Sequence, residues 1–186
     1  MTTRTSPFSR MTVALTGFMG CGKSSVGREL SMLLGIPLVD LDKYIVDKAG
    51  KSIPDIFAES GEQGFRDIET EALKEVLGAK DGTVFRGDTP GTRNLVLSLG
   101  GGTILRPENA ALIKERCKCF FLRASEETLR LHLGGEQSQR PLLKSGGFSA
   151  LLQERTPLYT AAADFIIDID RLSPMQVAGI IANLIS

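Results

Sequence analysis

The sequence lacks an excess of charge of either sign. Its 22 Lys and Arg residues balance 22 Asp and Glu residues, so the formal net charge is zero. Proteins that bind nucleic acid or a membrane surface through electrostatics carry a basic excess. The sequence therefore indicates neither a nucleic-acid partner nor a membrane-surface partner. It also lacks an apolar run long enough to span a bilayer.

Cysteine and histidine are scarce as well. The three cysteines are an odd number, which argues against a disulfide framework. Cys117 and Cys119 alternate along an expected strand without a second pair to hold zinc, and Cys21 is a candidate for an oxidation-sensitive thiol. The only histidine, His132, is interpreted as incidental to function. Residues 1–10 lack the apolar stretch of a secretory signal, and these features together favour a reducing cytoplasm.

The length and the hydrophobic pattern predict one α/β domain. The 186 residues are 42% hydrophobic, which suits a single domain, 1–186, with one core. Helical patterns alternate with short apolar runs, which are typical of a parallel sheet covered on both faces. The expected strands cover residues 12–16, 38–42, 95–99, 117–122 and 164–169. Residues 79–94 contain three glycines and a proline and predict a surface loop or a small hairpin.

A glycine-rich segment follows the first expected strand. Gly17 to Ser24 reads GFMGCGKS, which fits the pattern G-x-x-x-x-G-K-[ST], and a helical pattern follows it. Glycines let backbone N–H groups turn inward around a phosphate. The helix adds its N-terminal dipole, Lys23 adds a positive charge and Ser24 adds a hydroxyl for Mg²⁺. The segment predicts a site for the phosphates of a nucleotide.

Two further polar features follow expected strands. Asp40 and Asp42 are two residues apart, so on one strand their side chains would point to the same face. Carboxylates beside a triphosphate suggest a magnesium site and a base for a hydroxyl nucleophile, although a solvated strand end is the alternative. Gly100, Gly101 and Gly102 follow another strand and indicate either close approach to a ligand or a simple loop.

Three arginines are candidates for binding anions. Arg66 has Glu62 and Glu69 on the same helical face, so a surface ion-pair ladder is the alternative interpretation. Arg140 lies in the polar, glycine-bounded segment 134–147, where it could close over phosphates. Arg155 is suited to gripping a carboxylate, because a guanidinium is a planar fork of donors. Taken alone, either of the last two is more often a surface charge.

Taken together, these motifs resemble those of the shikimate kinase family. The order GFMGCGKS, DLD, GEQGFRDIE, SLGGG, QRPLL and ERTPLY covers nearly the whole chain. The resemblance implies a P-loop NTPase with a nucleoside-monophosphate-kinase-like, three-layer fold and a five-stranded parallel sheet. It also implies Mg²⁺-dependent transfer of the ATP γ-phosphate to the 3-hydroxyl of shikimate, on the route to chorismate and the aromatic amino acids. A monomer is expected.

The resemblance also implies a role for each matching residue. Lys23, Asp42 and Arg140 would be catalytic, and Glu69 would hold Arg66 in place. Magnesium would contact Ser24 and, through water, Asp40, with Ser98 as a further candidate. The residues expected to bind ATP are Gly20, Cys21, Gly22, Lys23, Ser24, Ser25, Arg140 and Pro174. The residues expected to bind shikimate are Asp42, Arg66, Gly100, Gly101, Gly102 and Arg155.

The resemblance also implies two functional segments within the domain, and the sequence differs from the family pattern in two places. A substrate-binding segment at about 42–70 and a lid at about 134–149 are expected, and Phe57 and Phe65 could flank the substrate ring. Residues 79–94 are longer than the usual link in this family. The family's adenine-stacking arginine falls near His132, so that contact is undefined. Alternatives are a kinase for another hydroxylated acid such as gluconate, or a catalytically inactive regulatory homologue.

Overall fold

The computed structural model describes residues 12–78, 94–134 and 147–186. The expected loop at 79–94 falls almost wholly outside these ranges, as do Arg140 and most of the expected lid. No helix in the described ranges is long and apolar enough to cross a membrane. The elements, in chain order, are β1 Thr12–Thr16, α1 Lys23–Leu34, β2 Leu38–Asp40, α2 Leu41–Ala49, α3 Ile53–Val76, β3 Leu95–Ser98, the 3₁₀ helix η1 Thr103–Leu105, α4 Pro107–Arg116, β4 Cys117–Arg123, α5 Glu126–Leu133, α6 Gly147–Ala162, β5 Phe165–Asp168 and α7 Pro174–Ile185.

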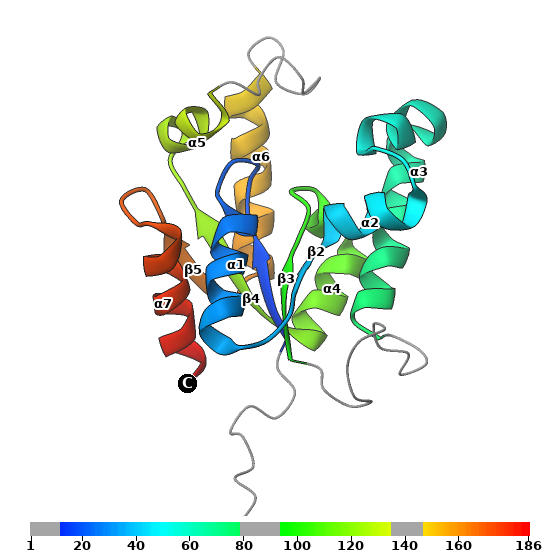
Figure 1. Cartoon of the computed structure of the whole chain (residues 1–186). Helices are drawn as coiled ribbons and strands as arrows, with labels where there is room; N and C mark the ends of the chain where they lie inside the picture. The colour runs from blue at the N-terminus through cyan, green and yellow to red at the C-terminus, as the bar shows by residue number, and fades with distance from the viewer. Residues whose placement is uncertain (1–11, 79–93, 135–146) are drawn as a thin grey trace, which may run out of the picture.

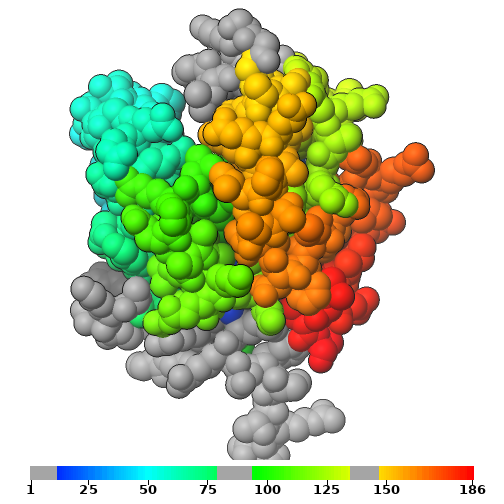
Figure 2. Space-filling model, turned by 180° about the vertical axis from the view of Figure 1, so that it is seen from behind, coloured from blue at the N-terminus to red at the C-terminus, as the bar shows by residue number. Residues whose placement is uncertain are grey.

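The five strands form one parallel sheet in the order β2-β3-β1-β4-β5. The expected five-stranded α/β architecture is therefore confirmed. Helices α1 and α7 cover one face of the sheet, and α4 and α6 cover the other (Figure 1). Figure 2 shows α4 and α6 side by side on this second face. Every residue of the central strand β1 is buried, as expected for a strand covered on both faces.

The boundary between β2 and α2 differs from the expectation. The strand ends at Asp40, and α2 begins at Leu41, so Asp42 lies in the first turn of a helix. The side chain of Asp40 caps this helix by accepting a hydrogen bond from the Lys43 N–H at 3.2 Å. The interpretation that Asp40 and Asp42 share one face of a strand is therefore wrong. Leu41 and Ile45 are buried and hold the helix against the core.

Helices α2 and α3 together carry the expected substrate-binding segment at about 42–70, and α3 bends at Gly61. This residue has φ 67° and ψ −177°, which lies outside the helical region and is accessible to glycine. Phe57, before the bend, stacks on Phe65, after it, with ring centroids 4.5 Å apart. Gly61 therefore divides α3 into two helical stretches. The second stretch directs Arg66 toward the carboxyl ends of the strands.

Candidate active site

The segment after β1 forms a glycine-dependent turn at the start of α1. Gly17, Gly20 and Gly22 have φ values of 144°, 83° and 83°, a region that side chains disfavour. Gly22 is the N-cap of α1 and has no side-chain cap, so helix N–H groups remain for an anion. The positive end of the helix dipole lies at the same place. The turn therefore has the geometry of a phosphate-binding loop.

Two side chains at the start of α1 point into this loop. The Lys23 ammonium donates hydrogen bonds to the carbonyl oxygens of Gly17 at 2.9 Å and Phe18 at 3.1 Å. The Ser24 hydroxyl donates to a carboxylate oxygen of Asp40 at 2.6 Å. A hydroxyl and a carboxylate are oxygen groups of the kind that Mg²⁺ prefers. In the described ranges, no group of three or more His, Cys, Asp or Glu side chains gathers as a metal site.

A cavity of about 210 Å³ connects the loop with the ends of β2 and β3. Asp40 and Asp42 line it from one side, and Ser98 and Gly101 line it from another. The register of the sheet explains the convergence, because Asp40 is paired with Ser98 and Ser98 with Leu15. The complete lining is Met19, Gly20, Gly22, Lys23, Ser24, Ser25, Asp40, Asp42, Ser98, Leu99 and Gly101.

Asp42 has an unusual electrostatic environment. Burial raises the pKa of its carboxyl to about 6, and the negative charges of Asp40 and Glu69 contribute to the rise. The positive charges of Lys23 and Arg66 oppose it. The carboxylate is therefore ionised at neutral pH but binds a proton more readily than an exposed aspartate. Such a group is suited to accepting a proton from a hydroxyl.

Two of the three glycines after β3, Gly100 and Gly102, make room for side chains of the protein itself. A Cβ at Gly100 would lie 2.6 Å from the Asp42 carboxylate and 2.8 Å from that of Glu69. A Cβ at Gly102 would lie 2.4 Å from the guanidinium of Arg66. Of the three, only Gly101 lines the cavity. Close approach to the backbone is therefore observed, and at Gly100 and Gly102 the approaching groups belong to the chain.

Arg66 belongs to a partly buried ion pair rather than to a surface ladder. Its guanidinium contacts the Glu69 carboxylate at 2.7 Å, and the two side chains are 12% and 1% exposed. Glu69 also accepts a hydrogen bond from Thr103 at 2.7 Å. Glu62 is 3.8 Å away and 68% exposed, so it contributes little. The buried partner turns Arg66 inward, toward Gly102.

Arg155 is buried without a carboxylate partner. The residue is 6% exposed, and its Nε has no hydrogen-bond partner in the structure. Among the described residues, it forms no ion pair. A buried guanidinium with no counter-charge is costly unless a ligand supplies one. Arg155 therefore suggests a binding site for an anion.

Two further residues contact the loops that form the site. The Nδ1 of His132 lies 2.8 Å from the carbonyl oxygen of Gly20 in the phosphate loop. Tyr159 is not among the residues expected at the site, yet its hydroxyl donates to the carbonyl oxygen of Gly101 at 2.5 Å. The signal for Tyr159 was its position four residues after Arg155, which puts both on one helical face. Cys21 is buried, and neither it nor Pro174 lines the cavity.

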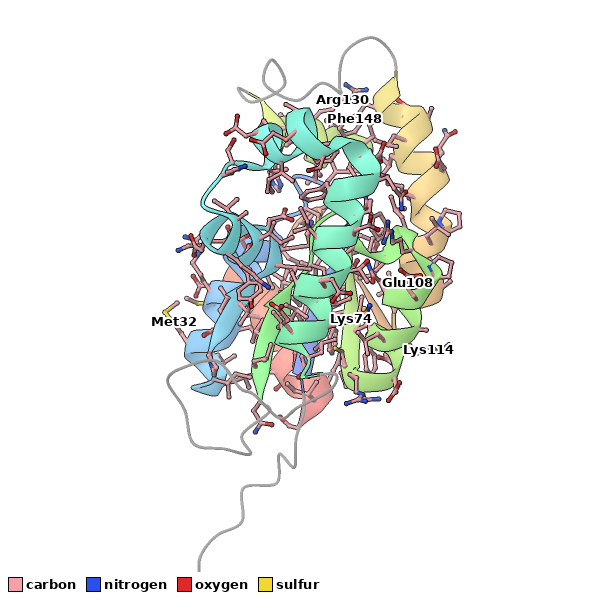
Figure 3. The ribbon with its side chains drawn as sticks, turned by 90° about the vertical axis from the view of Figure 1, so that its right-hand side faces the viewer. Met32, Lys74, Glu108, Lys114, Arg130 and Phe148 are labelled. Carbon is pink, nitrogen blue, oxygen red and sulfur yellow. The ribbon has the colours of Figure 1, made fainter. Side chains whose placement is uncertain are left out.

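The helices that flank residues 135–146 contact each other. The guanidinium of Arg130 in α5 lies 4.5 Å from the ring centroid of Phe148 in α6. Figure 3 shows these two side chains together at one end of the molecule, far from Met32. Ser149 donates a hydrogen bond to Glu126 at 2.7 Å. Phe148 also meets Phe18 of the phosphate loop edge-on, at 5.1 Å between centroids. The expected lid therefore begins and ends on elements packed against the loop.

Comparison with known proteins decides the family. The family model described as shikimate kinase matches residues 19–186. The chain belongs to the shikimate kinase family. The shikimate kinase of Dictyoglomus turgidum is 41% identical over 165 residues, which are 87% of this chain and 89% of that protein. The shikimate kinase of Salinibacter ruber is 38% identical, with 95% of this chain and 85% of that protein covered.

A solved structure of the same family has a similar fold. It is the shikimate kinase from Acinetobacter baumannii in complex with shikimate, with a TM-score of 0.82 and 32% identity. The similarity covers 95% of this chain and 93% of that one. The P-loop NTPase fold expected from the sequence is thereby confirmed.

Proposed function

We propose that the protein transfers the γ-phosphoryl group of ATP to the 3-hydroxyl of shikimate, forming shikimate 3-phosphate for chorismate and aromatic amino acid synthesis. One observation carries the proposal. A phosphate-binding loop and the desolvated carboxylate of Asp42 line the same cavity. Arg66 and Arg155 do not line this cavity, but they reach the glycine turn at its edge. Arg66 does so at Gly102, and Arg155 through Tyr159, which is hydrogen-bonded to Gly101. The family assignment gives independent support.

The phosphate half of the site holds the donor. Lys23 contacts the β- and γ-phosphates, and backbone N–H groups around Gly20, Cys21, Gly22 and Ser25 surround them. The Ser24 hydroxyl would ligate Mg²⁺, and Asp40 and Ser98 would hold water molecules bound to the ion. When bound, Mg²⁺ neutralises charge on the phosphates. The short hydrogen bond between Ser24 and Asp40 supports this assignment, because both groups are directed to the same point.

The acceptor half of the site holds shikimate. Asp42 orients the attacking hydroxyl and accepts its proton, and Arg66 and Arg155 bind the carboxylate. Gly101 contributes its backbone N–H, while Gly100 and Gly102 leave space for Asp42 and Arg66. Phosphoryl transfer depends on positioning and charge neutralisation more than on covalent catalysis. The positive charges of Lys23 and Arg66 that act on the buried carboxylate of Asp42 are suited to both tasks.

Several parts of the proposal rest on the family resemblance alone. Arg140 closes onto ATP with a lid at about 134–149, and Pro174 covers the adenine. The lid and the substrate-binding segment at about 42–70 belong to one domain, 1–186. We further propose a monomer in the cytoplasm. The free state of all three cysteines supports a reducing compartment.

Release of ADP with different acceptors tests the proposed function. The protein is incubated with ATP and Mg²⁺, and with shikimate, quinate, gluconate or no acceptor. Turnover confined to shikimate is expected, because two arginines match its carboxylate and Asp42 matches its hydroxyls. Turnover with gluconate alone would overturn the acceptor site and keep the phosphate loop. Bound ATP without turnover on any acceptor would indicate a regulatory homologue.

A further inference from the structure

Tyr159 connects parts of the acceptor site that come from different elements. It lies in α6 and is fully buried, and its ring packs against Phe121 of β4 with centroids 5.2 Å apart. Its hydroxyl donates to the carbonyl oxygen of Gly101 at 2.5 Å. The ring is therefore fixed by the sheet, and the hydroxyl reaches the glycine turn after β3.

The hydroxyl also faces Arg155. Arg155 lies four residues earlier in α6, on the same face of the helix. Burial raises the pKa of Tyr159 to about 12, while Arg155 opposes this rise through its charge and a hydrogen bond. The hydroxyl therefore stays protonated. It donates its one hydrogen to Gly101 and offers its lone pairs to the guanidinium.

Arg66 lies against the same glycine turn, at Gly102. The Gly101 carbonyl belongs to the peptide that joins Gly101 to Gly102. A Cβ at Gly102 would lie 2.4 Å from the Arg66 guanidinium, so that side chain rests against this peptide. The charge of Arg66 also acts on the Tyr159 hydroxyl. One buried hydroxyl is thus linked directly to Arg155 and, through one peptide, to Arg66.

We propose that Tyr159 is a positioning residue that sets the spacing and direction of Arg155 and Arg66 for a carboxylate. The proposal rests on the proposed function, because it assigns these arginines to the carboxylate of the acceptor. A phenol is suited to this task because it orients a guanidinium without neutralising it. A carboxylate in its place would compete with the ligand for Arg155. The neutral partner leaves the positive charge of Arg155 for the acceptor.

Tyr159→Phe removes one oxygen and keeps the packing of the ring. We expect its KM for shikimate to rise about tenfold, with KM for ATP unchanged and kcat within about threefold, because a misdirected guanidinium loses charge-assisted hydrogen bonds. Thr160→Val is the matched control. It removes a hydroxyl from the exposed side of the same helix, where Thr160 donates to the carbonyl oxygen of Thr156 at 2.9 Å, away from the cavity. We expect both its KM values to match those of the wild type.

Shikimate methyl ester separates positioning from general loosening of the site. The ester carries no negative charge, so the wild type should prefer the acid, and Tyr159→Phe should lose most of that preference. An equal loss of kcat/KM on acid and ester would overturn the proposal, as would an unchanged KM for shikimate.

Two further measurements keep these outcomes distinct. If Tyr159→Phe does not fold, Arg155→Lys provides the second test, because an ammonium cannot bond the hydroxyl and grip a carboxylate in the same geometry. The acid-specific loss is expected again, and an equal loss on acid and ester would overturn the proposal. Absence of wild-type turnover on shikimate would instead overturn the proposed function.

Discussion

At the scale of single residues, Asp42 is the most informative group in the site. Its carboxylate lies between two negative and two positive side chains, and burial makes the largest contribution to its raised pKa. A base with a pKa close to the working pH combines a useful fraction of the ionised form with adequate basicity. The electrostatics thus support the role of proton acceptor.

The pH dependence of turnover tests this role. Because the ionised form of Asp42 is required, kcat/KM for shikimate should fall about tenfold per unit as the pH drops below about 6. With saturating ATP and Mg²⁺, the apparent pKa should be no lower than 6 if the net charge of the bound nucleotide is negative. Direct quantification of ADP from pH 4.5 to 8.5 avoids coupling enzymes. An apparent pKa near 4, that of an ordinary aspartate, would contradict the assignment.

Residue types at motif positions could be predicted, and so could the pairing of Arg66 with Glu69 three residues later in the same helix, but contacts between distant elements could not. Arg66 and Arg155 stood out because of nearby motifs. The burial of the pair of Arg66 and Glu69 and the hydrogen bond from Thr103 to Glu69 depend on how α3 meets the turn after β3, which no local pattern specifies. The contact between Tyr159 and Gly101 joins residues 58 positions apart in the sequence. Local periodicity cannot indicate such a pair.

At the scale of elements, the glycine turn after β3 provides space for side chains from other elements. Gly102 has φ −109°, which any residue can adopt, so the backbone conformation does not require glycine there. What glycine provides at this position is the space that a Cβ would fill. Gly100 likewise admits Asp42 and Glu69. The turn therefore brings Asp42 and Arg66 close to the backbone that follows β3.

Gly102→Ala tests this function of the turn. The new methyl group would overlap Arg66, so the guanidinium must move, and we expect KM for shikimate to rise at least tenfold. KM for ATP should stay the same. Gly179→Ala in α7 is the control. A Cβ added at Gly179 would have no atom within 4 Å, so the variant should leave both KM values unchanged and stabilise the helix by about 1 kcal/mol. Wild-type KM for shikimate in Gly102→Ala would show that Arg66 is not held there.

Element types were predictable, whereas the end of β2 was not. Apolar runs and helical periodicity identified the strands and helices because these signals are local. The sequence Val39-Asp40-Leu41-Asp42 alternates like a strand, but Asp40 is also a good N-cap. Burial of Leu41 and Ile45 decided in favour of the helix. Asp42 therefore lies in a helix instead of a strand, and it still lines the cavity.

At the scale of the whole molecule, the sheet explains why the site forms where it does. Parallel strands direct their carboxyl ends to one edge, and the phosphate loop, the Asp40 cap and the glycine turn all follow those ends. The alternation of strands and helices was sufficient to predict this edge. The burial of charged groups there has an energetic cost that the rest of the fold must offset.

Asp42→Asn should therefore stabilise the protein. The folded-state pKa of Asp42 is about 6, above the ordinary value of 3.8. Below pH 4 the Asp42 carboxyl is protonated in both the folded and the unfolded state, so it does not change the free energy of unfolding. As the pH rises from 4 to 6, the carboxyl ionises in the unfolded state only, which stabilises that state and lowers the free energy of unfolding. Above pH 6 the cost is constant, at about 3 kcal/mol. Urea unfolding at pH 8 should show a gain of about 2–3 kcal/mol in the variant, and the gain should vanish near pH 4. A loss of stability at pH 8 would contradict this account.

The most direct test of the central claim is ADP release with shikimate, measured for the wild type and Asp42→Asn under the same conditions. The account predicts turnover by the wild type and a loss of at least a thousandfold in kcat in the variant, with ATP still bound, because the phosphate loop is intact. Near-normal kcat in Asp42→Asn would remove Asp42 from the reaction and contradict the mechanism proposed for this site.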